Sequence, residues 1–191
     1  MATDLQARTP IAASDFLIRK LDRWFASFDT DGDGVIDLLD FTGMAQLYCD
    51  AYEVPTRSET WRRMHERAHV LWRAIEQRTG AANPAKLTQE ELVSWLGSGE
   101  YADFVVLAAI PFSETAFSIA DADGDGRCNV HEMMAAQARS GMSEEEIHRS
   151  FDVLDFDGDG FVTLEDFTQA HLDFYFSDDP TAPGNLMAGD V

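Results

Sequence analysis

Cysteine is scarce in this chain of 191 residues, which contains only Cys49 and Cys128. Two thiols cannot build a disulfide framework, and the first residues have neither the basic start nor the apolar run of a secretion signal. The longest apolar run, 104–112, is too short to cross a membrane. Because residue 2 is Ala2 and not glycine, N-myristoylation is excluded as well. We therefore expect a cytoplasmic protein that does not act at a membrane.

Basic residues are scarce too. The chain has 14 Lys and Arg against 35 Asp and Glu, which gives a net charge of −21 at pH 7. Such a charge excludes ordinary nucleic-acid binding and disfavours anionic membrane surfaces. The chain is not an acidic disordered tail, because 45% of its residues are hydrophobic, including 13 Phe and 4 Trp. We expect Trp24, Trp61, Trp72 and Trp95 to be core residues rather than the wall of a ligand cavity.

Much of the acid lies in three copies of one pattern, at residues 29–40, 121–132 and 155–166. Each copy has aspartate at positions 1, 3 and 5, glycine at position 6, an apolar residue or cysteine at position 8 and an acid at position 12. This is the ligand spacing of an EF-hand calcium loop. Calcium takes about six to eight oxygen ligands, and glycine at position 6 permits the sharp turn around the ion. Three copies in frame exclude chance.

The predicted ligands follow the pattern position by position. Side chains at positions 1, 3, 5 and 12 and the backbone carbonyl at position 7 bind directly, and position 9 binds directly or through water. The three copies are named the first, third and fourth loops, because a second hand without this pattern fits between the first two copies. The ligands are Asp29, Asp31, Asp33, Val35, Asp37 and Asp40 in the first loop, Asp121, Asp123, Asp125, Arg127, Asn129 and Glu132 in the third, and Asp155, Asp157, Asp159, Phe161, Thr163 and Asp166 in the fourth. We therefore expect three calcium ions.

Position 12 differs among these loops. Glu132 is long enough to bind calcium with both carboxylate oxygens, whereas Asp40 and Asp166 are one methylene shorter. Since magnesium takes about six ligands, we expect it to compete at the first and fourth hands. The alternative is that shifts of the exit helices bring both aspartates close enough for bidentate contact.

A second hand fits between the first and third loops. Aligning Leu87 with loop position 8 places Glu91 at position 12, but Gly80, Ala82 and Pro84 then occupy positions 1, 3 and 5. These residues offer no carboxylate. We predict that this hand keeps its architecture without binding an ion, and that it completes the N-terminal pair.

Helix signals surround the loops. Apolar residues recur at helical spacing on both sides of each loop. Ser14 is positioned to cap the first helix, and Ser143 with Glu146 forms a capping box before the last loop. On the way into the third loop, Pro111 predicts a mild helix break, after which Ser113 can cap the chain again.

The sequence thus predicts an all-α, compact fold of four EF-hands in two pairs, with short β-bridges between the paired loops at position 8. We assign 14–100 to an N-terminal pair, whose first hand binds and whose second is degenerate. We assign 101–176 to a C-terminal pair, in which both hands bind. The remaining residues, 177–191, form a tail that packs on the body or is disordered.

Binding hands in the first, third and fourth places, a second hand without ligands and the short length together give the chain a family likeness. It resembles the calerythrin and sarcoplasmic calcium-binding protein family over roughly 14–176. The resemblance implies two halves packed into one body and an intracellular role in calcium buffering or transport. We expect a monomer.

Three other functions compete with the buffer. A calmodulin-like sensor, which would engage a protein partner, stays open, although the methionines are scattered and no flexible linker divides the hands. Photoproteins share the pattern of hands and hold a small ligand in a central cavity, but they end in proline and this chain ends in Val191. The segment His65-Glu66-Arg67-Ala68-His69 matches the HExxH pattern of zinc peptidases without an evident third ligand, so we do not expect an enzyme.

Overall fold

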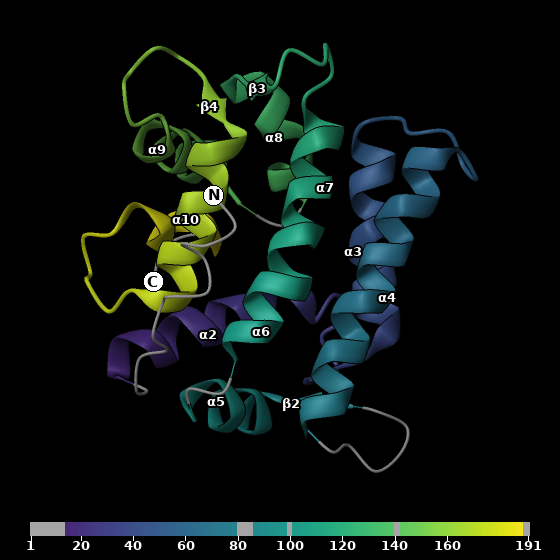
Figure 1. Cartoon of the computed structure of the whole chain (residues 1–191), viewed down its shortest axis with the longest axis vertical. Helices are drawn as coiled ribbons and strands as arrows, with labels where there is room; N and C mark the ends of the chain where they lie inside the picture. The colour runs from purple at the N-terminus through teal and green to yellow at the C-terminus, as the bar shows by residue number, and fades with distance from the viewer. Residues whose placement is uncertain (1–13, 80–85, 99–100, 140–141, 189–191) are drawn as a thin grey trace.

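Four helix–loop–helix units follow one another along the chain (Figure 1). The structure is a computed structural model that describes residues 14–79, 86–98, 101–139 and 142–188. The elements of the first hand are α2 (Asp15–Phe28), β1 (Val35–Ile36) and α3 (Leu38–Ala51), and those of the second are α4 (Glu59–Thr79), β2 (Leu87–Thr88) and α5 (Gln89–Gly97). The third hand has α6 (Ala102–Phe104), η1 (Val105–Ala109), α7 (Ile110–Ala120), β3 (Arg127–Cys128) and α8 (Val130–Arg139), and the fourth has α9 (Glu144–Leu154), β4 (Val162–Thr163) and α10 (Leu164–Phe176), followed by η2 (Pro183–Ala188).

The loops pair through short antiparallel bridges, as predicted. Ile36 of the first loop faces Leu87 of the second, and Cys128 of the third loop faces Val162 of the fourth. These four residues are the ones that the loop pattern places at position 8, and all are buried. The alignment of the second hand through Leu87 is therefore correct, and the all-α architecture with β-bridges is confirmed.

Several predicted helix boundaries are confirmed as well. The hydroxyl oxygen of Ser14 accepts a hydrogen bond from the N–H of Leu17 at 3.0 Å, which caps α2. Ser143 and Glu146 form both bonds of a capping box at the start of α9. In each case a side-chain oxygen satisfies an N–H group that the first helical turn leaves without a partner.

The predicted break at Pro111 is wrong. Residues 102–120 form one continuous helical rod, which stands upright near the centre of Figure 1. The turn before the proline widens into the π-helix η1, where the N–H of Ile110 donates to the carbonyl of Val105, five residues earlier. A widened turn makes room for the proline ring without ending the helix, so Ser113 is not needed as a cap and makes no capping bond. By length and composition this rod is apolar enough to cross a membrane, but 56% of it is buried inside the protein.

The central rod explains why the two halves share a core. Its helix α7 packs against α4 of the second hand and against α10 of the fourth. The larger hydrophobic cluster combines residues of the first two hands with residues of the rod and of the end of α10. Tyr101, at the entrance to the rod, donates from its hydroxyl to the carbonyl of Tyr175 at 2.8 Å. The core therefore crosses the predicted division at residue 100, although the loops pair on either side of it.

The tryptophans divide into two classes. Trp24 and Trp72 are buried in the larger cluster, as predicted, whereas Trp61 and Trp95 are only partly buried at its edge. The aromatic residues also leave a cavity of about 240 Å³ between the halves. Trp24 is thus a core residue that also forms part of the wall of this cavity.

Polar groups face that cavity among its aromatic and methionine side chains. Tyr48, Tyr52 and His171 line it, and burial raises the pKa of both tyrosines above their ordinary value. Burial also lowers the pKa of His171 to about 4, against a smaller opposing effect of its hydrogen bond to the Phe167 carbonyl. His171 is therefore neutral at pH 7.

A buried lysine joins the first helix to the last. Lys20 on α2 is fully buried, and its Nζ donates to the carbonyl of Ser177 at 2.6 Å and to that of Asp173 at 3.5 Å. These carbonyls lie at the C-terminal end of α10, where a cation also complements the helix dipole. Burial lowers the pKa of Lys20 to about 8, although Asp178 and Asp173 oppose the shift. The contact holds the segment after α10 against the first hand.

This lysine predicts a pH dependence. Between about pH 8 and 10.5 the unfolded chain binds more protons at Lys20 than the folded protein does, so the contribution of Lys20 to the free energy of unfolding rises with pH. Burial raises the pKa of Cys49 to about 11 and that of Cys128 to about 12, and their ionisation in the unfolded chain opposes the rise. Variants must therefore be compared with the wild type at each pH.

We expect denaturant unfolding of calcium-saturated protein to show that the wild type gains stability relative to Lys20→Arg and Lys20→Met as the pH increases through this range. Neither replacement titrates there. Parallel pH profiles for all three proteins would contradict the assignment.

Candidate metal centres

The three acidic loops share one backbone conformation. Glycines at positions 4 and 6 all have positive φ, between 71° at Gly32 and 87° at Gly160. This left-handed region is costly for residues with a Cβ atom, so glycine lets the loop turn twice in succession. The loop pattern predicts this role for the glycine at position 6, and the structure shows the same role at position 4.

The aspartate at position 1 organises each loop. Asp29, Asp121 and Asp155 come directly after the last residue of the entering helix. In every case one carboxylate oxygen accepts the N–H of position 5, at 3.1 Å, and the other accepts the N–H of position 6, at 2.8–3.1 Å. The loop is thereby folded around this carboxylate by its own backbone.

Each loop gathers three carboxylates. Single oxygens of all three members lie within 4.8 Å of one another in the groups Asp29, Asp31 and Asp40, Asp121, Asp123 and Glu132, and Asp155, Asp157 and Asp159. Hard oxygen donors at this spacing fit a calcium ion and leave the closely spaced negative charges uncompensated without a cation. The donor chemistry of the described residues thus agrees with the predicted sites.

Position 12 is held differently in the fourth loop. The N–H of position 2 donates to the acid at position 12 in the first loop, from Thr30 to Asp40 at 3.1 Å, and in the third, from Ala122 to Glu132 at 3.2 Å. In the fourth loop the N–H of Phe156 donates to the carbonyl of Leu154 instead. Without that bond across the loop, Asp166 lies outside its group of three.

The two aspartates at position 12 are therefore placed differently relative to the other acids of their loops. Asp40 is buried at 5% exposure and joins the carboxylates of positions 1 and 3. Asp166 instead accepts bonds from the N–H and hydroxyl of Thr163, at 3.0 and 2.6 Å. Asp40 also accepts the N–H of Asp37 at 2.8 Å, so the two loops differ in the bond from position 2 and not in the bond from position 9.

The remaining predicted ligands have structural roles as well. Side-chain oxygens of position 9, from Asp37, Asn129 and Thr163, accept N–H groups of the first turn of each exit helix. Of the position 7 residues, Val35 and Arg127 lie in the β-bridges and Phe161 comes directly before β4. Asp33 and Asp125 at position 5 lie outside the groups of three, whereas Asp159 belongs to its group.

The silent second hand retains only part of this scheme. Glu91 at position 12 accepts the N–H of Thr88 at 2.9 Å and caps α5, and this backbone N–H is the main reason that its pKa is lowered. Gly80, Ala82 and Pro84 lie outside the described residues. Within the described part of the chain, Glu91 belongs to no group of three acids.

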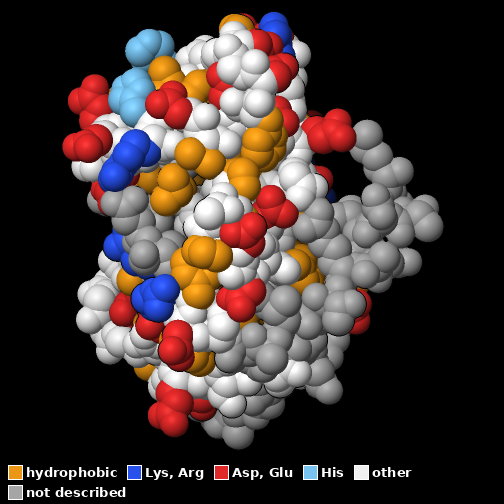
Figure 2. Space-filling model, turned by 90° about the vertical axis from the view of Figure 1, so that its left-hand side faces the viewer, with side chains coloured by type: hydrophobic (Ala, Val, Ile, Leu, Met, Phe, Trp, Pro, Cys, Tyr) orange, Lys and Arg blue, Asp and Glu red, His pale blue; other side chains and the backbone are white. Residues whose placement is uncertain are grey.

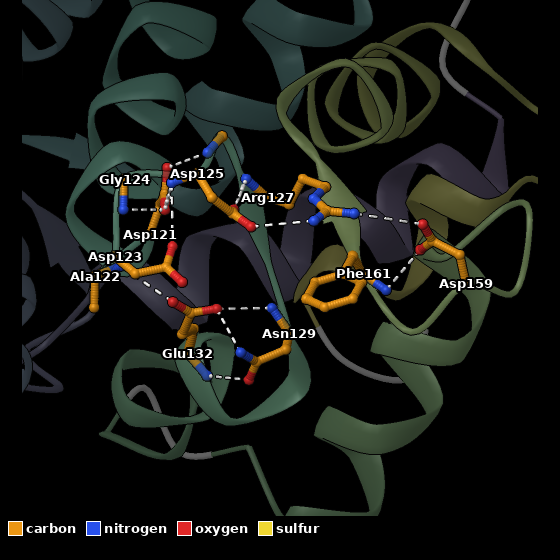
Figure 3. A network of polar contacts seen from close by, with 11 residues as sticks. Asp121, Ala122, Asp123, Gly124, Asp125, Arg127, Asn129, Glu132, Asp159 and Phe161 are labelled. Atoms are coloured by element: carbon orange, nitrogen blue, oxygen red, sulfur yellow. Dashed lines mark hydrogen bonds and ion pairs between the residues drawn. The ribbon is translucent and has the colours of Figure 1, made fainter.

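Two basic side chains whose contacts the loop pattern does not predict reach into these loops, those of Lys86 and Arg127. Lys86 of the silent loop lies 3.1 Å from Oδ2 of Asp33 in the first loop. The pKa of Asp33 is lowered, first by the N–H of Val35 and then by Lys86. Arg127 lies 3.2 Å from Oδ2 of Asp125. Its planar guanidinium lies over the ring of Phe161 in the neighbouring loop, with Cζ 4.3 Å from the ring centroid (Figure 3). Both bases occupy loop position 7, and that shared position is the signal that could have revealed them.

The HExxH segment lies on α4. The Nδ1 of His65 lies 3.0 Å from the carbonyl oxygen of Trp61, and its ring stacks on the indole with 3.7 Å between centroids. Neither His65 nor His69 belongs to a group of three metal ligands among the described residues. The first histidine of the pattern thus packs against its own helix.

Comparison with protein families agrees with the loops. The family model described as an EF-hand domain pair matches residues 113–170, which hold the third and fourth loops. A second model, described as an EF hand, matches residues 21–44 around the first loop.

Individual relatives cover most of the chain. Calerythrin from Saccharopolyspora erythraea is 27% identical over 173 residues, which are 88% of this chain and 94% of calerythrin. The structure of a calcium-binding protein from Streptomyces coelicolor is 29% identical with a TM-score of 0.73, and the match covers 84% of this chain and 98% of that one. A sarcoplasmic calcium-binding protein from amphioxus has the same fold, with 18% identity, a TM-score of 0.72 and coverage of 94% and 100%. Together with the family models, these matches support an EF-hand calcium-binding protein related to calerythrin.

The different surroundings of Glu132 and Glu91 predict that the same substitution at each residue has a different effect on calcium affinity. Glu132→Gln removes the charged oxygen at position 12 of the third loop, so calcium affinity at that site should fall by about tenfold or more. Glu91→Gln makes the same change in the silent loop and should leave every calcium affinity unchanged. Isothermal titration calorimetry of both variants checks the prediction, and equal effects would contradict it.

Proposed function

Because the chain belongs to the EF-hand calcium-binding proteins of the calerythrin and sarcoplasmic calcium-binding protein family, we propose that it buffers or transports calcium through three sites. The sites are the first, third and fourth loops. Their ligands are the residues predicted from the loop pattern, with the side chain of Asp166 the weakest contributor. We further propose that the protein acts as a monomer in the cytoplasm.

The observation that supports a buffering function most directly is the hydrophobic core shared by the two halves. In a sensor, an EF-hand pair opens and exposes an apolar groove to a target. Here the rod 102–120 enters the third loop and at the same time fills the core of the first two hands. Opening one pair would remove apolar side chains that the other pair needs for its own packing.

Surface charge supports the monomer. Acidic side chains are spread from top to bottom of the face in Figure 2, with hydrophobic side chains gathered between them. A net charge of −21 makes copies of the chain repel each other, and three Ca²⁺ ions add only 3 × 2 = +6 of the missing positive charge. The repulsion therefore persists in the loaded protein.

Two alternatives have a specific observation behind them. The Streptomyces coelicolor structure is described as a basis for calcium-mediated regulation, which favours a sensor that engages a protein partner. The cavity of about 240 Å³ between the halves favours a binder of a small apolar ligand. Its neutral His171 and its tyrosine hydroxyls would orient such a ligand.

One titration separates the three functions. Calorimetry of the apo protein should return three calcium ions, because the silent hand offers no carboxylate at positions 1, 3 and 5. Fluorescence of an environment-sensitive dye in the same titration should fall as calcium is added, because loading tightens the shared core. A fourth tight ion would contradict the count.

Dye fluorescence that rises instead would contradict the buffer. The variant Ala116→Phe places a larger side chain in the cavity and then distinguishes a small-ligand site from a sensor. A rise that this variant abolishes indicates the small-ligand site, whereas a rise that survives indicates an opened groove and a sensor.

Magnesium competition should be strongest at the fourth site. Asp166→Glu lengthens the acid that lies outside its group of three, so we expect the ratio of calcium to magnesium affinity there to rise by about three- to tenfold. Asp40→Glu should change the first site less, since Asp40 is already in its group. Glu132→Asp at the third site is the reverse control and should lower the ratio. Competition calorimetry measures all three, and equal responses of Asp40→Glu and Asp166→Glu would contradict the structural distinction.

A further inference from the structure

The aspartate at position 5 has one oxygen already in use. In each acidic loop its Oδ1 accepts the N–H of position 7, at 3.0 Å in Asp33, 2.9 Å in Asp125 and 2.9 Å in Asp159. Among the described residues, the Oδ2 atoms of these three aspartates accept no backbone N–H group.

A base faces that oxygen in all three loops. Lys86 Nζ lies 3.1 Å from Oδ2 of Asp33, and Arg127 lies 3.2 Å from Oδ2 of Asp125 and 3.8 Å from Oδ2 of Asp159 (Figure 3). Lys86 directly precedes β2, and Arg127 lies in β3. Lys86 reaches across its β-bridge to position 5 of the paired loop. Arg127 makes its shorter contact with Asp125 of its own loop and its longer contact with Asp159 across the bridge.

The distance to the base parallels the position of the carboxylate. Asp33 and Asp125, with a base at 3.1 and 3.2 Å, lie outside the groups of three oxygens. Asp159, with its base at 3.8 Å, lies inside its group. Close pairing with a base thus accompanies withdrawal of the position 5 carboxylate from the other acids of its loop.

From this geometry we propose that Lys86 and Arg127 are tethered cations that compete with calcium for the position 5 carboxylates and so set the affinity of the sites. The inference rests on the proposed function of the three loops. It gives the silent hand a direct effect on the first site, because its lysine takes a ligand that the ion needs. Arg127 links the third and fourth sites, since one guanidinium faces a ligand of each.

The size of the effect follows from exposure. The side chains of Lys86 and Asp33 are 47% and 43% exposed, so water and salt screen their attraction. A unit charge in such surroundings changes the affinity for a divalent ion by about three- to tenfold at low salt. The competition should therefore tune the sites without abolishing them.

The test uses Lys86→Met, with Lys86→Arg as the matched control that keeps the charge. Calcium titration followed through the amide resonances of Gly34, Gly126 and Gly160 reports each site separately. We expect Lys86→Met to tighten the first site by about three- to tenfold at low salt, and this gain should shrink in 1 M KCl. Lys86→Arg should stay close to wild type, and the third and fourth sites should not respond to either variant.

Lys86→Met should change the stability of the apo protein in the opposite direction to its calcium affinity. Without calcium, the substitution removes a counter-ion from the acids of the first loop, so the melting temperature of the apo protein should fall slightly while its calcium affinity rises. Arg127→Met, which keeps an apolar contact with Phe161, should tighten the third and fourth sites together.

An unchanged or weakened first site in Lys86→Met, with Gly34 still responding to calcium, would overturn the inference and leave the three-site function intact. If Gly34 does not respond to calcium even in the wild type, the proposed function of the first loop fails and the inference fails with it. The two failures are thus distinguishable by one resonance.

Discussion

Repulsion among clustered carboxylates is the constraint on which this structure depends. Three loops each hold acidic oxygens within 4.8 Å of one another, in a chain that has 14 basic residues against 35 acidic ones. Backbone N–H groups offset part of that repulsion, as at Asp29, whose two oxygens accept the N–H groups of Asp33 and Gly34. A cation is needed to offset the rest, so calcium binding to the folded loops adds to the free energy of unfolding.

The silent hand separates what a loop does for the fold from what it does for the ion. Leu87 still faces Ile36 across the bridge, and Glu91 still caps its exit helix. Pairing and capping therefore survive without the carboxylates of positions 1, 3 and 5, because hydrophobic contact and backbone hydrogen bonds maintain them. The second loop also contributes Lys86, a single positive charge 3.1 Å from Oδ2 of Asp33 in the first loop.

Features that depend on the spacing of residues in the sequence pattern could be predicted. Features that depend on the backbone conformation of a loop or on contacts between the two halves could not. The loop positions and the caps at Ser14 and Ser143 follow from residues a few positions apart. The bridge pairs join residues far apart in the sequence, but position 8 of each loop pattern predicts which residues pair. The different placements of Asp40 and Asp166 depend on a backbone bond across the loop, which identical ligand spacing does not reveal. The cavity is likewise the product of side chains from both halves, and no pattern within one hand predicts it.

The halves are connected at the sites themselves, which bears on how calcium acts. Asp121 directly follows the rod that fills the N-terminal core, so an ion in the third loop holds the end of a helix belonging to both halves. The hydroxyl of Tyr52, after the exit helix of the first hand, donates to the backbone carbonyl of Glu132 at 2.6 Å. This bond connects the exit helix of the first hand to position 12 of the third loop. If loading orders these loops, we expect it to tighten both halves together, and Tyr52, which also belongs to the cavity wall, lies at the contact between them.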